Sequence, residues 1–278
     1  MTVNSIKQQL ISELESVTDS PVFEANELLI AALKINRTNL AFSGKDSVSK
    51  SGQRRIYKLL AKRKKGIPLQ YILGDWEFYS LAFKVGKGVL IPRADSELLV
   101  DLALEEINNK QNILLFDLCA GSGAIGIAVG KNSPTTCVTL VEKSKKAFKY
   151  LTQNSKLNGF NGTAVRANIF NWVPCEKADI VLSNPPYITK KEMKTLQKEV
   201  KNEPSLALFG GNDGLKFYKF LTQNADRFLK NGGKLMVEIG AAQGADVINL
   251  FKANGFDDVQ IFKDINQNDR VVLGTYNK

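Results

Sequence analysis

The sequence predicts an α/β protein with an open, mostly parallel β-sheet covered by helices on both faces, preceded by a small helical bundle. Three observations favour this fold class. From Asp95 onward, short continuous apolar segments alternate with segments of helical periodicity. The first of these apolar segments runs directly into a glycine-rich loop. Residues 1–70, by contrast, carry helical patterns alone.

Residues 1–70 are predicted to form a domain of three helices. The first has apolar residues at helical spacing, and Ser20-Pro21 is a start signal for the second. The third is expected from Val48 to Lys65, and Gly66 follows it.

The third predicted helix contains the densest basic run of the chain, "RRIYKLLAKRKK" at residues 54–65. Its residues Ile56, Leu59 and Leu60 recur at helical spacing, so we expect the basic groups to share the outer face. That face is either simply solvated or contacts nucleic acid or an acidic protein. The net charge of +10 favours an anionic partner.

Residues 71–92 are rich in aromatic and branched side chains and are broken by Gly86 and Gly88, which predicts a β-hairpin linking two domains. Residues 93–278 then form the α/β domain. Its seven expected strands are ILLFDLC, CVTLVE, GTAVRAN, ADIVLSN, GKLMVEIG, VQIFKD and RVVLGTY.

The composition excludes several kinds of chemistry. The chain has no histidine, which removes histidine metal sites, Ser-His-Asp triads and histidine bases. Cys119, Cys137 and Cys175 lack a metal-type spacing and are expected to be reduced thiols, so no metal is expected. No signal-peptide pattern and no apolar run of about 20 residues occurs. We therefore expect a cytoplasmic protein with no membrane partner. A monomer is expected as well, although the sequence carries no signal for the oligomeric state.

The glycine loop "FDLCAGSGAIGIAVG", residues 116–130, has the position at which α/β sheets bind nucleotides. Gly121 and Gly123 allow a tight turn and close approach of a ligand to the following helix N-terminus. A glycine loop can also be a simple strand-to-helix turn. Glu142, 19 residues after Gly123, is placed to accept hydrogen bonds from both ribose hydroxyls of an adenosine.

Asp117 distinguishes between two nucleotide ligands. A carboxylate at the end of the first strand repels the pyrophosphate of a nicotinamide dinucleotide but suits a cationic ligand. S-adenosylmethionine carries an ammonium and a sulfonium and no phosphate, so the sign of the charge favours the methyl donor.

The segment "SNPPYI", residues 183–188, follows the buried strand ADIVL. Two consecutive prolines cannot continue a sheet ladder or a helix, because each lacks a backbone N–H. The chain therefore enters a stiff turn that fixes the side chains of Asn184 and Tyr187 at a strand end.

Together, the glycine loop, the acid at the second strand and NPPY resemble a class I (Rossmann-like) S-adenosylmethionine-dependent methyltransferase. The segments QYILGDWEF, VLIPRADSE, EPSLALFGGNDGLKFYK, LMVEIGAAQG and DRVVLG resemble, more narrowly, the HemK/PrmC family. The resemblance runs from about Lys58 to Gly274 and implies a seven-stranded, mostly parallel sheet. This family methylates the glutamine amide nitrogen, N5, in the Gly-Gly-Gln motif of class I peptide chain release factors and so tunes translation termination.

The resemblance implies the roles of the NPPY residues. The Asn184 side-chain oxygen and the Pro185 carbonyl would each accept one N–H of the substrate amide, within a turn stiffened by Pro186. Tyr187 would cover the flat amide. No general base is needed, because the nitrogen becomes strongly acidic only once methylated. The helical domain would recognise the release factor.

The resemblance also implies a site for the donor and for its product, S-adenosylhomocysteine, without a metal. Relatives tend to carry an acid and an aromatic residue after the third strand, where this chain has Asn168 and Ile169. Phe170 is a second candidate to cover the adenine ring. The donor-binding residues implied are Asp117, Cys119, Ala120, Gly121, Ser122, Gly123, Glu142, Asn168, Ile169 and Asn184.

Three further positions have weaker assignments. Arg93 is expected either to pair with Asp95 or Glu97 or to shape the floor under the donor. Glu203-Pro204 and Gly210-Gly211 are expected in a loop beside the substrate. Glu238 is expected to be a structural end to its strand.

Two other functions remain open from the sequence. NPPY is shared with adenine-N6 methyltransferases acting on DNA or RNA, which the basic run also suits. However, no inserted target-recognition domain follows the core, so no stable nucleic acid partner is expected. A catalytically silent S-adenosylmethionine-binding module is the third reading, and intact Asn184 and Tyr187 argue against it.

Overall fold

The structure is a computed structural model that describes residues 1–108 and 110–278. The chain forms two compact units. The helical unit comprises Met1–Asp75 together with Gln197–Asn202, and the sheet unit comprises Trp76–Leu196 and Glu203–Lys278. A short segment from the C-terminal half of the chain therefore belongs to the N-terminal unit.

Five helices build the helical unit. The three expected helices are present, and two short ones, α3 and α5, were not predicted. Thr2, Asn36 and Ser49 cap α1, α3 and α4, since each side chain accepts a hydrogen bond from the backbone N–H three residues ahead. The helices are α1 (Val3–Leu14), α2 (Pro21–Leu33), α3 (Arg37–Phe42), α4 (Lys50–Lys64) and α5 (Leu69–Leu73). Their core is formed by Ile6, Leu10, Leu14, Leu28, Leu29, Ile56 and Leu60.

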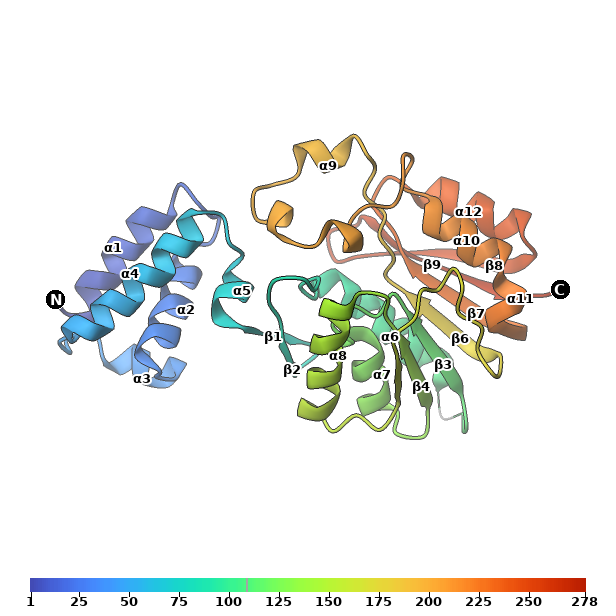
Figure 1. The fold of residues 1–278 in the computed structure, drawn as a ribbon, viewed down its shortest axis with the longest axis horizontal. Helices are drawn as coiled ribbons and strands as arrows, with labels where there is room; N and C mark the ends of the chain where they lie inside the picture. The colour runs from blue at the N-terminus through green and yellow to red at the C-terminus, as the bar shows by residue number, and fades with distance from the viewer. Residues whose placement is uncertain (109) are drawn as a thin grey trace. The chain divides into compact units, whose positions relative to one another are not determined.

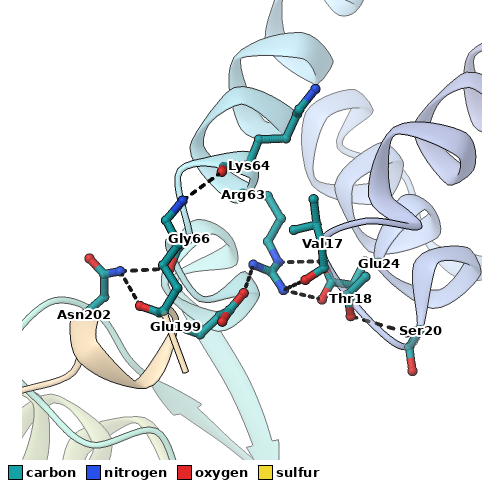
Figure 2. A network of polar contacts seen from close by, with 10 residues as sticks. Val17, Thr18, Ser20, Glu24, Arg63, Lys64, Gly66, Glu199 and Asn202 are labelled. Carbon is teal, nitrogen blue, oxygen red and sulfur yellow. Dashed lines mark hydrogen bonds and ion pairs between the residues drawn. The ribbon is translucent and has the colours of Figure 1, made fainter. Parts of the chain in front are cut away.

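Arg63 lies inside this unit, so the expectation that every basic group of residues 54–65 shares the outer face is wrong at this position. Only 4% of Arg63 is exposed. Its Nε and Nη2 donate to the two carboxylate oxygens of Glu24 on α2, at 2.7 and 3.1 Å, and its Nη1 donates to Glu199 at 2.7 Å. Figure 2 shows the guanidinium between the two carboxylates. Burial of a charge is tolerated here because it is paired on two sides.

The segment Gln197–Asn202 is held by backbone acceptors as well. The Asn202 side chain donates to the Gly66 carbonyl at 2.9 Å, and Lys198 Nζ lies 3.5 Å from the Lys64 carbonyl (Figure 2). These contacts, with the Arg63–Glu199 pair, explain why six residues distant in sequence fold with the helices.

A two-stranded hairpin, β1 (Asp75–Phe78) and β2 (Leu81–Lys84), lies within the region expected to form one. All of it but Asp75 belongs to the sheet unit. The main sheet has seven strands, as predicted, in the order β5-β4-β3-β6-β7-β9-β8. All neighbours are parallel except β9, which runs antiparallel to β7 and β8. The strands are β3 (Leu114–Leu118), β4 (Cys137–Val141), β5 (Thr163–Val165), β6 (Ala178–Ser183), β7 (Leu229–Glu238), β8 (Phe256–Lys263) and β9 (Asp269–Tyr276).

Helices cover both faces of this sheet (Figure 1). Alternate strand residues point to opposite faces, so Leu115 and Leu182 pack with one set of helices while Phe116 and Val181 pack with the other. The first set is α6 (Glu97–Ile107), α7 (Ala124–Asn132) and α8 (Lys145–Leu157). The second is α10 (Lys216–Gln223), α11 (Ala225–Phe228) and α12 (Gly244–Ala253). Short helical turns complete the sheet unit at η1 (Ala94–Ser96), α9 (Glu192–Thr195) and η3 (Ser205–Ala207). A further turn, η2 (Val200–Asn202), belongs to the helical unit.

The strand order places a switch point between β3 and β6. The connection that leaves β3 leads to β4 on one side of it, whereas β6 lies on the other side of β3. The connections that follow β3 and β6 therefore diverge at the carboxyl ends of these two strands. Ligands bind at such points in open α/β sheets. In the residues that the structure describes, no helix is both long and apolar enough to cross a membrane.

Candidate active site

A cavity of about 720 Å³ lies at the carboxyl ends of β3, β4 and β6, within the sheet unit. Its volume is in the range of small-molecule sites. Of the predicted residues, those that line it are Cys119, Gly121, Glu142, Asn168, Ile169, Phe170, Asn184, Pro186 and Pro204. Ala120 and Ser122 line a smaller pocket beside it, which also reaches Cys119, Gly121 and Asn184.

The loop between β3 and α7 turns through three residues with positive φ: Cys119 (66°), Gly121 (56°) and Gly123 (82°). Gly123 faces the protein interior, where an added Cβ would lie 2.9 Å from Ile127, and so serves the turn rather than the cavity. Gly126, not singled out from the sequence, lets α7 approach the sheet, because a Cβ there would lie 2.3 Å from Leu140 on β4 and 3.0 Å from Asp117 on β3. The third glycine of GSGAIG is the signal that could have revealed it.

Glu142 directly follows β4 and lines the cavity. One oxygen accepts from the Gly121 N–H at 2.9 Å and the other from the Ser144 N–H at 2.5 Å. Burial raises the pKa of Glu142 and outweighs these hydrogen bonds, which oppose the rise. The carboxylate is thus oriented by the loop, and each oxygen keeps a lone pair for a ligand hydroxyl.

Asp117 lies beneath the loop and does not line the cavity. It is 1% exposed, and its Oδ2 accepts from the Gly126 N–H at 2.9 Å. Its Oδ1 is buried with no hydrogen-bond partner among the described residues. Burial raises the pKa of Asp117 to about 7, helped by the charge of Glu142. An unpartnered carboxylate oxygen under the loop favours a cationic ligand above it.

Asn168, Ile169 and Phe170 follow β5 and line the opposite wall. The Asn168 side-chain oxygen lies 3.4 Å from the Phe170 N–H. The Phe170 ring packs on Phe217 with ring centroids 5.4 Å apart, and Lys216 Nζ lies 5.1 Å from its centroid. This side of the cavity is therefore mainly apolar, and its polar groups are the Asn168 amide and Lys216. The Lys216 contact has no sequence signal of its own, because it depends on how α10 packs.

The NPPY turn projects Asn184 into the cavity from the end of β6. Asn184 Nδ2 donates to Ser96 Oγ at 3.1 Å, and Ser96 Oγ donates to Glu238 at 2.5 Å. Pro185 and Pro186 are buried, and Tyr187 is half-buried and does not line the cavity. Burial, with the charge of Glu238, raises the pKa of Tyr187 to about 12.

The segment after Glu203 runs beside the NPPY turn. The Ile188 N–H donates to the Leu208 carbonyl at 2.8 Å, and the Gly210 N–H donates to the Ile188 carbonyl at 2.9 Å. A Cβ on Gly210 would lie 2.6 Å from the Pro186 carbonyl oxygen, so the close approach requires glycine. Pro204, Leu206 and other residues of this segment line the cavity.

Arg93 pairs with neither of its expected partners. It forms an ion pair with Glu203, which is 6% exposed and also accepts from the Ile91 N–H at 3.0 Å. Asp95 lies 3.4 Å from Arg270, and Glu97 accepts from the Tyr79 N–H. The sequence could not reveal the pair, because 110 residues separate its members. Arg93 does line the smaller pocket, next to Pro92.

Glu238 is more than the end of a strand. Its carboxylate contacts Ser96, which in turn contacts Asn184, and it is 1% exposed. No group of three potential metal ligands among histidine, cysteine, aspartate and glutamate occurs in the part of the chain that the structure describes.

Comparisons with known proteins bear on both units. The PrmC N-terminal domain model matches residues 6–74, and the Methyltransferase small domain model matches residues 94–208. A release factor glutamine methyltransferase of Thermodesulfovibrio yellowstonii is 39% identical over 268 residues, covering 95% of each chain. One from Fusobacterium nucleatum subsp. nucleatum is 40% identical over 258 residues, covering 91% of this chain and 73% of that protein.

The fold has relatives among solved structures. The crystal structure of a methyltransferase from Pyrococcus furiosus superposes with a TM-score of 0.56 at 17% identity, covering 81% of this chain and 98% of that chain. At this identity the similarity concerns the fold alone.

Proposed function

The chain belongs to the family of release factor glutamine methyltransferases, and on this premise we propose that it methylates a release factor from S-adenosylmethionine. The proposed target is the side-chain nitrogen N5 of the glutamine in the Gly-Gly-Gln motif of class I release factors. One observation carries the proposal in this chain: Asn184 reaches the cavity with its Nδ2 already bonded to Ser96. Its Oδ1 is the atom left for an incoming N–H.

The cavity suits the methyl donor. Glu142 offers two oriented oxygens, as a ribose with two hydroxyls requires. The unpartnered Asp117 oxygen supplies negative potential for an ammonium and a sulfonium, and would repel a pyrophosphate. Ile169 and Phe170 form an apolar wall for an adenine, with the Asn168 amide beside it. When bound, S-adenosylmethionine supplies an electrophilic methyl group.

A glutamine amide nitrogen is a poor nucleophile, because its lone pair is delocalised into the carbonyl. Asn184 Oδ1 and the Pro185 carbonyl would each accept one N–H of this amide, aiming the nitrogen at the donor. The rigid turn holds both acceptors in place before the substrate arrives. Positioning of this kind lowers the activation barrier by several kcal/mol, on the order of the effect of one preorganised polar contact. The family resemblance assigns Tyr187 the role of covering the amide, but its side chain does not line the cavity in this structure. Since the pKa of Tyr187 is about 12, it stays protonated and is no base, and the proton released after transfer goes to water.

We further propose that the helical unit recognises the release factor. Its exposed lysines on α4 provide positive charge for an acidic surface. The alternative, an adenine-N6 methyltransferase, shares the NPPY turn but is not favoured. The named relatives match the helical unit as well as the sheet unit, over nearly the whole chain.

Incubating the protein with labelled donor, a release factor and nucleic acid together tests the assignment. Label should appear in the release factor alone. Changing the glutamine of its Gly-Gly-Gln motif to asparagine moves the nitrogen by one methylene and should reduce labelling sharply. Label in nucleic acid, or undiminished label on the asparagine variant, would contradict the proposed substrate.

A further inference from the structure

Three polar side chains from separate segments form a chain that ends at the reacting centre. Asn184 follows β6, Ser96 ends η1 and Glu238 ends β7. Asn184 Nδ2 donates to Ser96 Oγ at 3.1 Å, and Ser96 Oγ donates to Glu238 Oε2 at 2.5 Å. Ser96 is 3% exposed and Glu238 is 1% exposed, so solvent does not compete for either hydrogen bond.

The direction of these hydrogen bonds decides which Asn184 atom faces the cavity. A carboxylate can only accept, so Ser96 must give its single proton to Glu238. The Ser96 oxygen is then an acceptor, and it selects the NH₂ end of the Asn184 amide. An asparagine amide has nearly the same shape when rotated by half a turn, so hydrogen-bond partners alone distinguish its two ends.

The reversed amide would be unproductive. It would present an NH₂ group to the NH₂ group of the substrate glutamine, two donors facing each other with no acceptor between them. In the orientation observed, Oδ1 is the end directed away from Ser96. A charged acceptor at the far end of the chain also polarises both hydrogen bonds in the same direction.

We propose that Ser96 and Glu238 are positioning residues that keep the Asn184 oxygen turned toward the substrate amide. The inference rests on the proposed function, since it assigns them a part in orienting the acceptor for that amide. Glu238 lines neither pocket, and Ser96 lines only the smaller one, beside Asn184, so we assign both residues an action through Asn184.

The charge of Glu238 is set by groups on every side of it. Arg270 on β9 lowers its pKa and Asp95 raises it, and Arg270 itself pairs with Asp264 at 2.9 Å and lies 3.4 Å from Asp95. The Tyr218 hydroxyl donates to the Glu238 backbone carbonyl, and Tyr187 lies close enough for the Glu238 charge to raise its pKa. Burial outweighs these contributions and the side-chain hydrogen bonds from Ser96 and from Asn184 that oppose it, raising the pKa of Glu238 to about 7.

Protonation of Glu238 would remove the fixed direction of the hydrogen bonds from Asn184 through Ser96 to Glu238. A neutral Glu238 can donate to Ser96, which frees the Ser96 proton for the Asn184 oxygen and permits the reversed amide. Turnover at saturating donor and substrate should therefore fall as the pH drops through about 7. Glu238→Gln cannot ionise, so its turnover should be low and should lack this limb of the pH profile.

The test compares Ser96→Ala and Glu238→Gln with wild type and with Ser155→Ala. Ser155 on α8 is a matched control, because its hydroxyl also donates one partly buried hydrogen bond, to the Leu151 carbonyl. Ser155 does not line the cavity. Ser96→Ala should lower kcat about 10- to 100-fold, as for an indirect loss of a preorganised contact. Affinity for S-adenosylhomocysteine and the melting temperature should stay near those of wild type, and Ser155→Ala should behave as wild type throughout.

Two results would overturn the positioning role: wild-type kcat in Ser96→Ala, or an unchanged pH limb in Glu238→Gln. If Glu238→Gln does not fold, Ser96→Ala decides alone. A wild-type protein that leaves the release factor unmethylated overturns the proposed function and this role with it. An active wild type with an equally active Ser96→Ala overturns the positioning role only.

Discussion

Two buried carboxylates show how their surroundings give the same chemical group different tasks. Glu142 has both oxygens oriented by loop N–H groups and faces the cavity. Asp117 has one oxygen bonded to the α7 backbone and the other without a partner among the described residues. The first can recognise hydroxyls by direction, whereas the second can act only through its charge.

Glu142→Ala should weaken binding of S-adenosylhomocysteine by ~1–3 kcal/mol, the cost of losing a charge-assisted hydrogen-bond acceptor. Glu142→Gln should lose less, because it keeps one acceptor oxygen for the loop or the ligand. Titration calorimetry measures both. The exposed Glu176→Ala is the matched control. Wild-type affinity in Glu142→Ala would remove this residue from the donor site.

Donor affinity should also depend on pH through Asp117. Its pKa is raised to about 7 in the free protein, so at lower pH a proton must leave before a cationic ligand gains from the charge. Affinity should therefore be full above pH 7 and decline below it, by up to about tenfold per pH unit. Asp117→Asn should bind more weakly at pH 8 and show a flatter profile. A pH-independent affinity in wild type would contradict the electrostatic role.

At the scale of elements, α4 carries two kinds of basic side chain. Lys58, Lys62 and Lys65 are exposed, whereas Arg63 is buried between Glu24 and Glu199. The pairing raises the pKa of Arg63 and lowers that of Glu199, although burial opposes both shifts. The lysines can therefore serve recognition, and the arginine holds the segment 197–202 in the helical unit.

Replacing Lys58, Lys62 and Lys65 with serine should raise KM for intact release factor and leave kcat and the melting temperature unchanged. The effect should shrink with added salt, because exposed charges act over about one Debye length. Steady-state kinetics at low and high salt measure this. Equal KM values at low salt would leave these lysines as a solvated face.

Arg63→Ala should behave in the opposite way. Removing one member of a buried ion pair leaves two carboxylates without their cation, which costs about 3–5 kcal/mol. The melting temperature should fall at any salt concentration, and proteolysis should increase within residues 197–202. Arg37→Ala is the matched control, since its pair with Glu27 has the arginine 76% exposed. Equal melting of the two variants would contradict the structural role of Arg63.

At the scale of the whole molecule, local pattern predicted what is local. The seven strands, the glycine loop and the stiff NPPY turn follow from periodicity and from proline and glycine chemistry, and the mostly parallel sheet is confirmed. The pairs Arg93–Glu203 and Arg63–Glu199 join residues more than 100 positions apart, and no local pattern indicates them. The same holds for Ser96 and Glu238, which meet only because η1 and β7 end at the same place.

The central claim is that the Asn184 oxygen accepts the substrate amide, and the turnover of Asn184→Ala tests it most directly. Methylation of the release factor glutamine, followed by mass spectrometry, should fall at least about 100-fold. Asn184→Asp, which keeps an acceptor but loses the NH₂ group that bonds Ser96, should also be impaired. Affinity for S-adenosylhomocysteine should change little in either variant. Retained turnover in Asn184→Ala would contradict the mechanism, even with methyl groups found on glutamine.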